Sequence, residues 1–351
     1  MYKRQQLALI EAARAGRSAL LVAPTGGGKT LAGFLPSLIE LAESPSDGLH
    51  TLYVSPLKAL AVDVHRNLEQ PITELALGLR AETRTGDTPP SKRARQRVKP
   101  PQLLLTTPES LALMLADPQA RTQFATLRVI VLDELHALEA SKRGDLLALG
   151  LARLASLAPS ARRVGLSATI ADPPRLARWL GAGLDELPLI VRGRGGVHPD
   201  VRILMPEARM PWAGHMALAA MPDVYNALCQ ARSAIVFVNT RAQAELCFHA
   251  LWRLNEQKLA IALHHGSLAV EQRRKVEAAM AAGRLRAVVA TSSLDLGIDW
   301  GDVDLVVQVG APKGASRLLQ RIGRANHRLD VPSRALLVPA NRFEVLELSL
   351  I

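Results

Sequence analysis

Ala23-Pro24-Thr25-Gly26-Gly27-Gly28-Lys29-Thr30 is the stretch that decides the fold. It follows the apolar run 19–22 and precedes a helical pattern that begins at Leu31. Consecutive glycines allow backbone N–H groups to surround a chain of phosphates, while Lys29 supplies a charge for the β- and γ-phosphates and Thr30 a hydroxyl for Mg²⁺. The helix N-terminus favours an anion. The stretch predicts a nucleotide-binding loop; a glycine-rich turn before a helix is the alternative.

Short runs rich in Val, Ile and Leu alternate with helical patterns on both sides of this loop, which is typical of parallel βαβ units. Helices are expected at 30–43, 57–69, 108–116 and 143–157. Strands are expected near 18–23, 50–54, 80–85, 102–106, 127–132, 163–167, 233–238, 260–263, 286–290, 304–308 and 334–338. Gly and Pro between 191 and 199 indicate a hinge. The chain is therefore predicted to be α/β, with two doubly wound domains at 1–190 and 216–351 joined by a linker at 191–215.

Composition narrows the class of protein. The 351 residues include 43 Lys and Arg against 32 Asp and Glu, a net charge of +11. This excess suits a polyanionic partner such as nucleic acid, although a basic proteome gives the same balance. Cys229 and Cys247 form no metal-ligand pattern and are expected to be reduced thiols. No run is as long as a membrane span and no secretory signal opens the chain, so a cytoplasmic location is expected.

A pair of carboxylates follows the apolar run 129–132, in the stretch Asp133-Glu134-Leu135-His136. A phosphate loop needs a carboxylate on a second strand to hold Mg²⁺, and Asp133 stands in that position. Glu134 is placed to polarise an attacking water as general base. The alternative is an acidic helix cap after a strand.

With these motifs the chain resembles the superfamily 2 DExH-box helicases, which have two tandem RecA-like domains, each a mostly parallel sheet with helices on both faces. It is most similar to the large helicase-related group and, within it, to the bacterial ligase-associated helicases, which 210–215 and 311–315 also resemble. The resemblance implies that Gln6 reads adenine, although an exposed N-terminal Gln is the alternative. It also implies that Gly297 and Asp299 approach the ATP ribose, with a helix cap as the alternative for Asp299. In Gln320-Arg321-Ile322-Gly323-Arg324, Arg324 is the arginine finger and Gln320 supports it.

The same resemblance assigns loops after several strands to the nucleic-acid backbone. These loops offer helix N-termini, hydroxyls and one lysine, which suit phosphates rather than bases. The residues concerned are Pro56, Lys58, Thr85, Gly86, Thr107, Pro108, Glu109, Asn239, Thr240, Arg241, His265, Gly266, Thr291 and Ser292. Singly, the loops of the first half also fit plain helix caps, and His265 a structural histidine. Ser167, Ala168 and Thr169 are implied to couple hydrolysis to strand movement, with His136 as their partner.

These implications describe an enzyme that hydrolyses ATP with Mg²⁺ between two domains and moves 3′-to-5′ along single-stranded or tailed nucleic acid. DNA is favoured, RNA or hybrid strands being alternatives, and a monomer acting in DNA repair beside a ligase or nuclease is expected. Two alternative hypotheses remain: an RNA-directed DExH helicase, and a nucleotide-gated binding module with little unwinding.

Both ends of the chain are relevant to the hypothesis of a binding module with little unwinding. Residues 1–5 resemble the translated end of a sequencing adapter, and the chain stops at Ile351 within an apolar-periodic stretch. The expectation is a core fragment that lacks a winged-helix domain and later domains. Such a fragment is predicted to hydrolyse ATP weakly and to unwind poorly.

Overall fold

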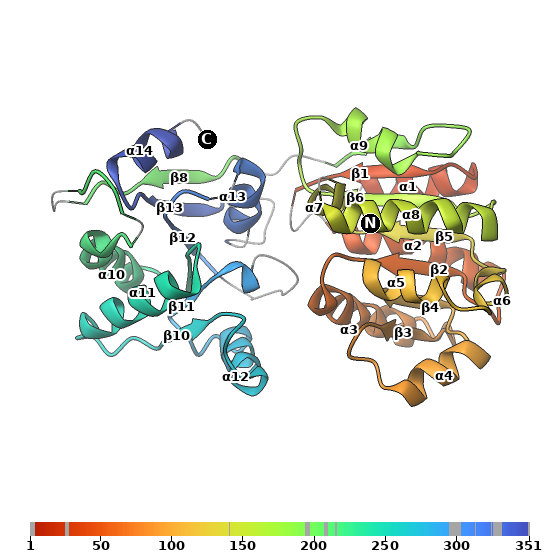
Figure 1. Cartoon of the computed structure of the whole chain (residues 1–351), viewed down its shortest axis with the longest axis horizontal. Helices are drawn as coiled ribbons and strands as arrows, with labels where there is room; N and C mark the ends of the chain where they lie inside the picture. The colour runs from red at the N-terminus through yellow and green to blue at the C-terminus, as the bar shows by residue number, and fades with distance from the viewer. Residues whose placement is uncertain are drawn as a thin grey trace. The chain divides into compact units, whose positions relative to one another are not determined.

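The computed structural model divides into two compact units, unit 1 (Met1–Arg194) and unit 2 (Gly195–Ile351), each built on a parallel sheet (Figure 1). The structure describes residues 4–24, 28–139, 141–193, 197–206, 210–214, 216–294, 303–312, 314–323, 325 and 332–349. Within these ranges, no helix combines the length and the apolar character that a membrane crossing requires.

Unit 1 contains a sheet whose described strands number seven and are all paired in parallel, in the order β3-β4-β2-β5-β6-β1-β7. The strands are β1 (Ala19–Val22), β2 (Thr51–Val54), β3 (Ala81–Arg84), β4 (Leu103–Thr106), β5 (Val129–Leu132), β6 (Arg162–Ser167) and β7 (Leu189–Arg192). Strands β1, β2, β4 and β5 are buried along their whole length. Burial on both faces explains why these strands read as continuous apolar runs in the sequence.

Helices cover both faces of this sheet. They are α1 (Arg4–Arg14), α2 (Lys29–Glu43), α3 (Lys58–Glu74), α4 (Pro90–Val98), α5 (Pro108–Leu115), α6 (Ala120–Phe124), α7 (Leu135–Glu139), α8 (Lys142–Leu157) and α9 (Pro173–Leu180). Successive strand residues enter different cores: Leu20 packs in the core that includes α5, α8 and α9, and Leu21 in the core that includes α1, α2 and α3. Burying one such leucine contributes about 1.5–3 kcal/mol, so the alternation fixes which helix lies on which face.

Unit 2 repeats the architecture with a parallel sheet whose described strands follow the order β10-β11-β9-β12-β13-β8. The strands are β8 (Asp200–Ile203), β9 (Ala234–Phe237), β10 (Ile261–His264), β11 (Ala287–Ala290), β12 (Leu305–Val309) and β13 (Arg334–Val338). The helices are η1 (Leu218–Ala220), α10 (Met221–Gln230), α11 (Arg241–Arg253), α12 (Val270–Ala281), η2 (Ser292–Leu294), α13 (Ala315–Ile322) and α14 (Arg342–Ser349). One face packs against α10 and α11, and the other against α12, α13 and α14.

The strands predicted from the sequence are confirmed, and so are the two α/β units with parallel sheets. Strands β7 and β8 were not predicted from the sequence. Strand β8 lies inside the predicted linker 191–215 and pairs with β13 at the edge of the second sheet. None of its four residues is buried, and Val201 and Arg202 are exposed, so the apolar pattern that marks the central strands is lacking. The predicted domain bounds stay a proposal.

Candidate nucleotide site and nucleic-acid interface

Three neighbouring strands of unit 1 carry the predicted nucleotide residues at their carboxyl ends. Strand β6 pairs with β5 on one side and with β1 on the other. The glycine loop follows β1, Asp133 follows β5, and Ser167 is the last residue of β6. Loops at the carboxyl ends of adjacent parallel strands share one edge of a sheet, which is where α/β folds bind ligands.

Lys29 opens helix α2 at this edge. Gly28 before it adopts φ 77° and ψ 30°, a left-handed conformation that glycine takes without a Cβ penalty. The Lys29 side chain is buried, and its Nζ donates to the carbonyl oxygens of Ala23 at 3.0 Å and Pro24 at 3.2 Å. Its ammonium therefore lies against the backbone that leaves β1. Thr25, Gly26 and Gly27 lie outside the described residues.

Asp133 is buried at the end of β5 and held by two hydrogen bonds. Its Oδ2 accepts from the Tyr53 hydroxyl at 2.6 Å, and its Oδ1 accepts from the backbone N–H of Glu134 at 2.8 Å. Burial and the nearby Glu134 charge raise the pKa of Asp133 to about 6, against the lowering effect of the Tyr53 bond. Sequence reasoning missed Tyr53, because a tyrosine inside a buried strand looks like a core residue. Its polar hydroxyl was the available signal.

Glu134 follows in a constrained conformation. Its φ of 47° lies in the left-handed region, which non-glycine residues seldom adopt and which is found at functional sites. Its Oε2 is buried and has no hydrogen-bond partner among the described residues. His136 Nε2 lies 3.5 Å from that oxygen. An oxygen that keeps acceptor capacity is compatible with a general base, which must lie within hydrogen-bond reach of the attacking water.

His136 is brought to Ser167 across the site, as expected. Its Nδ1 lies 3.2 Å from the Ser167 hydroxyl and accepts from the Ala168 N–H at 3.4 Å. Burial and the Lys29 charge lower the pKa of His136 to about 4. The imidazole is therefore neutral near pH 7, and an Nδ1 that accepts leaves the proton on Nε2, facing Glu134. Ser167, His136 and Glu134 thus form a series of polar contacts from the end of β6 to the acidic pair.

The donor set fits a magnesium–nucleotide. Asp133 supplies a buried carboxylate, Glu134 an oxygen without a partner among the described residues, and Lys29 a fixed positive charge. Thr30 lies in the first turn of α2, beside Lys29. Hard oxygen ligands of this kind are those that Mg²⁺ takes beside phosphates.

The other half of the same sheet edge carries the predicted backbone contacts of unit 1. Pro56 and Lys58 follow β2, Thr85 and Gly86 follow β3, and Thr107 to Glu109 follow β4, and these strands are neighbours in the order β3-β4-β2. Lys58 and Gly86 are exposed, whereas Pro56, Thr85, Thr107 and Pro108 are buried. Lys58 Nζ donates to Asp87 at 2.8 Å, and the Glu109 carboxylate binds Arg143.

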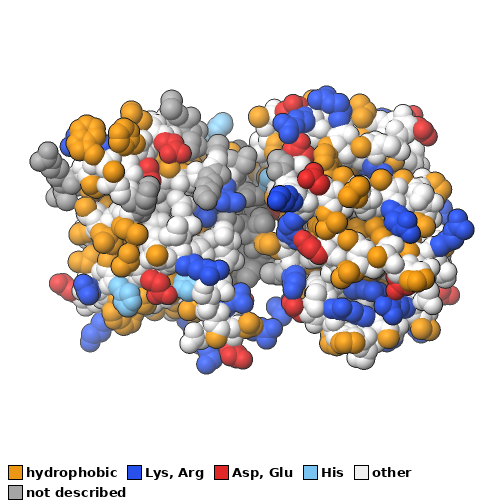
Figure 2. Space-filling view, in the orientation of Figure 1, with side chains coloured by type: hydrophobic (Ala, Val, Ile, Leu, Met, Phe, Trp, Pro, Cys, Tyr) orange, Lys and Arg blue, Asp and Glu red, His pale blue; other side chains and the backbone are white. Residues whose placement is uncertain are grey.

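Helix α4 adds positive charge next to these loops. Arg93 donates to the carbonyl oxygens of Thr85 and Gly86 at 3.2 and 2.7 Å. Figure 2 shows Lys and Arg side chains over the part of unit 1 where α4 lies in Figure 1. Glu82 pairs with Arg95 of this helix, so part of its charge is neutralised.

Unit 2 presents its predicted contacts at the carboxyl ends of β9, β10 and β11, which are neighbours in the sheet. Asn239, Thr240, Arg241, Gly266 and Ser292 are exposed there, and Thr291 is buried. The Thr240 hydroxyl caps α11 by accepting from the Gln243 N–H at 3.1 Å. His265 is buried, with Nε2 2.8 Å from Glu245, and Nδ1 accepts from the Ser267 N–H. These contacts favour the structural alternative for His265.

Several predicted residues cannot be placed. Gly297, Asp299 and Arg324 lie outside the described residues, as does the side chain of Gln320 on α13. Gln6 is described: it is buried in α1, so the alternative of an exposed N-terminal glutamine is wrong.

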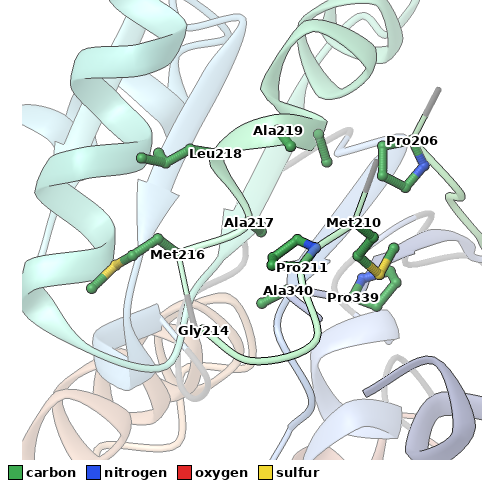
Figure 3. Close-up of a pocket in the computed structure, with 11 residues that line it drawn as sticks. Pro206, Met210, Pro211, Gly214, Met216, Ala217, Leu218, Ala219, Pro339 and Ala340 are labelled. Carbon is green, nitrogen blue, oxygen red and sulfur yellow. The ribbon is translucent and has the colours of Figure 1, made fainter. Parts of the chain in front are cut away.

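A pocket of about 230 Å³ lies elsewhere in unit 2 (Figure 3). It is lined by Pro206, Met210, Pro211, Gly214, Met216, Ala217, Leu218, Ala219, Ala220, Pro339 and Ala340. Among these described residues there is no titratable side chain and none predicted to bind nucleotide or nucleic acid. We assign this apolar pocket no part in the site.

Comparison with known families accounts for both units. Residues 3–176 match the DEAD/DEAH box helicase family, and residues 220–328 match the helicase conserved C-terminal domain. The chain therefore belongs to the superfamily 2 helicases, as the motifs indicated. More particularly, its relatives show that it is of the Lhr type. The chain thus belongs to the large helicase-related group; the narrower likeness to ligase-associated helicases stays a prediction.

Two curated relatives illustrate this similarity. The chain is 39% identical to the Lhr helicase/probable uracil glycosylase of Mycolicibacterium smegmatis, over 94% of the chain and 25% of that protein. It is 38% identical to the ATP-dependent helicase Lhr-Core of Methanothermobacter thermautotrophicus, over 99% of the chain and 43% of that protein. The chain thus spans less than half the length of these relatives.

Solved structures support the same fold. The helicase Lhr of Mycobacterium smegmatis bound to ssDNA and AMP-PNP superposes with a TM-score of 0.86 at 40% identity, over 99% of this chain and 47% of that one. Mss116p bound to ssRNA and AMP-PNP superposes with a TM-score of 0.79 at 19% identity, over 95% of this chain and 68% of that one. The two units are tandem RecA-like domains, as predicted.

Proposed function

We propose that this chain hydrolyses ATP and uses the energy to move 3′-to-5′ along single-stranded DNA in DNA repair. One observation carries the ATP-hydrolysing and strand-binding parts of the proposal: Lys29, Asp133, Glu134 and the His136–Ser167 pair converge at the carboxyl ends of β1, β5 and β6, beside loops in which Lys58 and Gly86 are exposed. The direction of movement and the role in repair are what the family resemblance implies. ATP and a polyanionic strand would thereby share one sheet edge.

Each residue of unit 1 has a role that its surroundings support. Lys29 holds the β- and γ-phosphates, and Thr30 and Asp133 hold Mg²⁺, which neutralises charge on the phosphate oxygens when bound. Glu134 accepts the proton of the attacking water through its buried Oε2. His136, neutral and bonded to Ser167, links this base to β6, so a shift of residues 167–169 would reach the acidic pair.

For unit 2 we propose the roles that the family resemblance implies. Arg324 would stabilise the charge of the transferring phosphoryl group with support from Gln320, while Gly297 and Asp299 would approach the ribose. Gln6 would read adenine from α1. The domain bounds 1–190 and 216–351 belong to this proposal, with turnover requiring both domains.

The substrate class is argued from chemistry and from one relative. Backbone N–H groups, hydroxyls and Lys58 bind phosphates without reading bases, so the loops select a strand and not a sequence. The M. smegmatis structure holds ssDNA, and at 40% identity it supports DNA for this chain. A repair pathway, and a DNA ligase or nuclease as partner, complete the proposal.

ATP hydrolysis by the 351-residue chain, with and without oligothymidylate, tests the proposal. The rate is expected to rise with the oligonucleotide. Equal rates would contradict a strand-coupled ATPase. Competition between DNA and RNA of one sequence then separates the substrates, because only RNA carries the 2′-hydroxyl. Stronger competition by RNA would replace DNA with RNA in the proposal.

A further inference from the structure

We propose that Arg143 is a positioning residue that holds the loops after β2 and β4 in the arrangement that receives the nucleic-acid backbone. It also connects both loops to helix α7, which follows the acidic pair. This inference rests on the proposed function and adds to it a residue that no motif of the sequence singled out.

Arg143 contacts both loops with a single guanidinium. Its Nε and Nη2 donate to the two carboxylate oxygens of Glu109 at 2.5 and 2.9 Å. Its Nη1 donates to the carbonyl oxygen of Pro56. The pKa of Glu109 falls to about 2, chiefly because of the hydrogen bond from Arg143. A planar fork that binds a carboxylate in two places fixes direction as well as distance, which a lysine does not do.

The charges explain why this contact is needed. Glu109 lies in the first turn of α5, directly after the loop that follows β4, where phosphates are expected, and a carboxylate there would repel them. The Pro56 carbonyl adds a second acceptor on the neighbouring loop. Arg143 neutralises the Glu109 carboxylate and donates a hydrogen bond to the Pro56 carbonyl. With both groups paired, this edge of the sheet is compatible with an anionic strand. We infer that Glu109 acts through Arg143 and does not contact the backbone directly.

Close packing fixes the position of Arg143. Ser141 caps α8: its hydroxyl accepts from the Gly144 N–H at 3.2 Å and donates to the Leu138 carbonyl at 2.8 Å. At Gly144, a Cβ atom would lie 2.0 Å from that same carbonyl oxygen. The first turn of α8 therefore rests directly on the end of α7, and only glycine permits this approach. Because α7 begins two residues after Asp133, a shift of the acidic pair would carry Arg143 with it.

The experiment measures binding of labelled oligothymidylate by fluorescence anisotropy and the oligonucleotide concentration that half-stimulates ATP hydrolysis. The variants are Arg143→Ala and Arg143→Lys. Arg175→Ala is the matched control: Arg175 also pairs with a glutamate of unit 1, Glu139 at 2.8 Å, but bonds to neither loop.

Arg143→Ala is expected to raise the dissociation constant and the half-stimulating concentration roughly tenfold, with a smaller change in the maximal rate, because charged hydrogen bonds between loops are lost. Arg143→Lys keeps the charge that neutralises Glu109 but loses the fork that holds both loops, so most of the loss seen in Arg143→Ala should remain. Arg175→Ala should match the wild type. A wild-type result for Arg143→Lys, or equal losses in Arg143→Ala and Arg175→Ala, would overturn the inference. If the wild-type chain itself shows no stimulation, the proposed function fails first and the inference with it.

Discussion

Replacing Tyr53 by Phe removes the hydroxyl that donates a hydrogen bond to Asp133 of the acidic pair. That hydroxyl donates to Asp133 at 2.6 Å, and both residues are buried. The ring itself would stay in place, because it stacks on Phe34 with centroids 5.2 Å apart. The variant therefore isolates a single charge-assisted hydrogen bond to the carboxylate that we assign to Mg²⁺.

The size of the effect follows from burial. A hydrogen bond to a charged group contributes about 1.5–3 kcal/mol, and no water replaces the hydroxyl at a fully buried position without rearrangement. Loss of a group that orients a metal ligand commonly costs about 10–100-fold in metal affinity. We expect the half-saturating Mg²⁺ concentration for ATP hydrolysis to rise about tenfold, and the free energy of unfolding without Mg²⁺ to fall by about 1–2 kcal/mol.

Two titrations check this prediction: ATP hydrolysis against Mg²⁺ concentration, and denaturant unfolding in a chelator. Tyr225→Phe is the control, because the Tyr225 hydroxyl bonds to the backbone N–H of Gln257 in unit 2, far along the chain from the site. The control should keep the wild-type Mg²⁺ dependence. An unchanged Mg²⁺ dependence in Tyr53→Phe would show that the hydroxyl does not position Asp133.

Two further predictions concern stability. Gly144→Ala should destabilise unit 1 by roughly 3 kcal/mol or more, since its Cβ would lie 2.0 Å from the Leu138 carbonyl oxygen. Gly150→Ala in the same helix is the control: its Cβ would meet side-chain atoms at 3.4 Å, so stability should be unchanged or rise by up to about 1 kcal/mol. Similar unfolding midpoints for the two variants would contradict the close packing at Gly144. The pKa of His136 is lowered to about 4 in the folded state, so below pH 6.5 the unfolded chain binds a proton that the folded chain does not. His136 should therefore lower the stability by up to about 3 kcal/mol as the pH falls from 6.5 to 4, whereas Asp133, with its pKa raised to about 6, acts in the opposite direction. His136→Gln should remove the His136 contribution, so that the variant gains stability relative to the wild type as the pH falls in denaturant titrations; an unaltered pH profile would show that His136 is not buried neutral.

The central strands and the nucleotide residues were predictable because their constraints are local. A strand buried on both faces must be apolar throughout, and a phosphate loop needs glycine before its lysine. The strand 19–22 and the pair Gly28-Lys29 can therefore be recognised from the sequence alone. The acidic pair was placed for the same reason: it directly follows such a strand. The joint presence of these motifs identified the family.

The rest depends on contacts between distant parts of the chain. Tyr53 lies 80 residues from Asp133, and although its hydroxyl indicates that a partner is needed, the sequence does not show which group that partner is. Arg143 appears as an ordinary basic residue at a helix start until the fold brings it to Pro56 and Glu109. Strand β8 at the sheet edge is defined by its pairing with β13 and not by an apolar run.

The central claim is that Lys29 and the acidic pair form one site that binds and hydrolyses ATP. The most direct test compares Glu134→Gln with the wild type, measuring both hydrolysis in the presence of oligothymidylate and ATP binding at equilibrium. Loss of a general base typically costs about 10²–10⁴ in rate, so hydrolysis should fall by at least 100-fold while ATP binding is retained. Hydrolysis at the wild-type rate in Glu134→Gln would contradict the account.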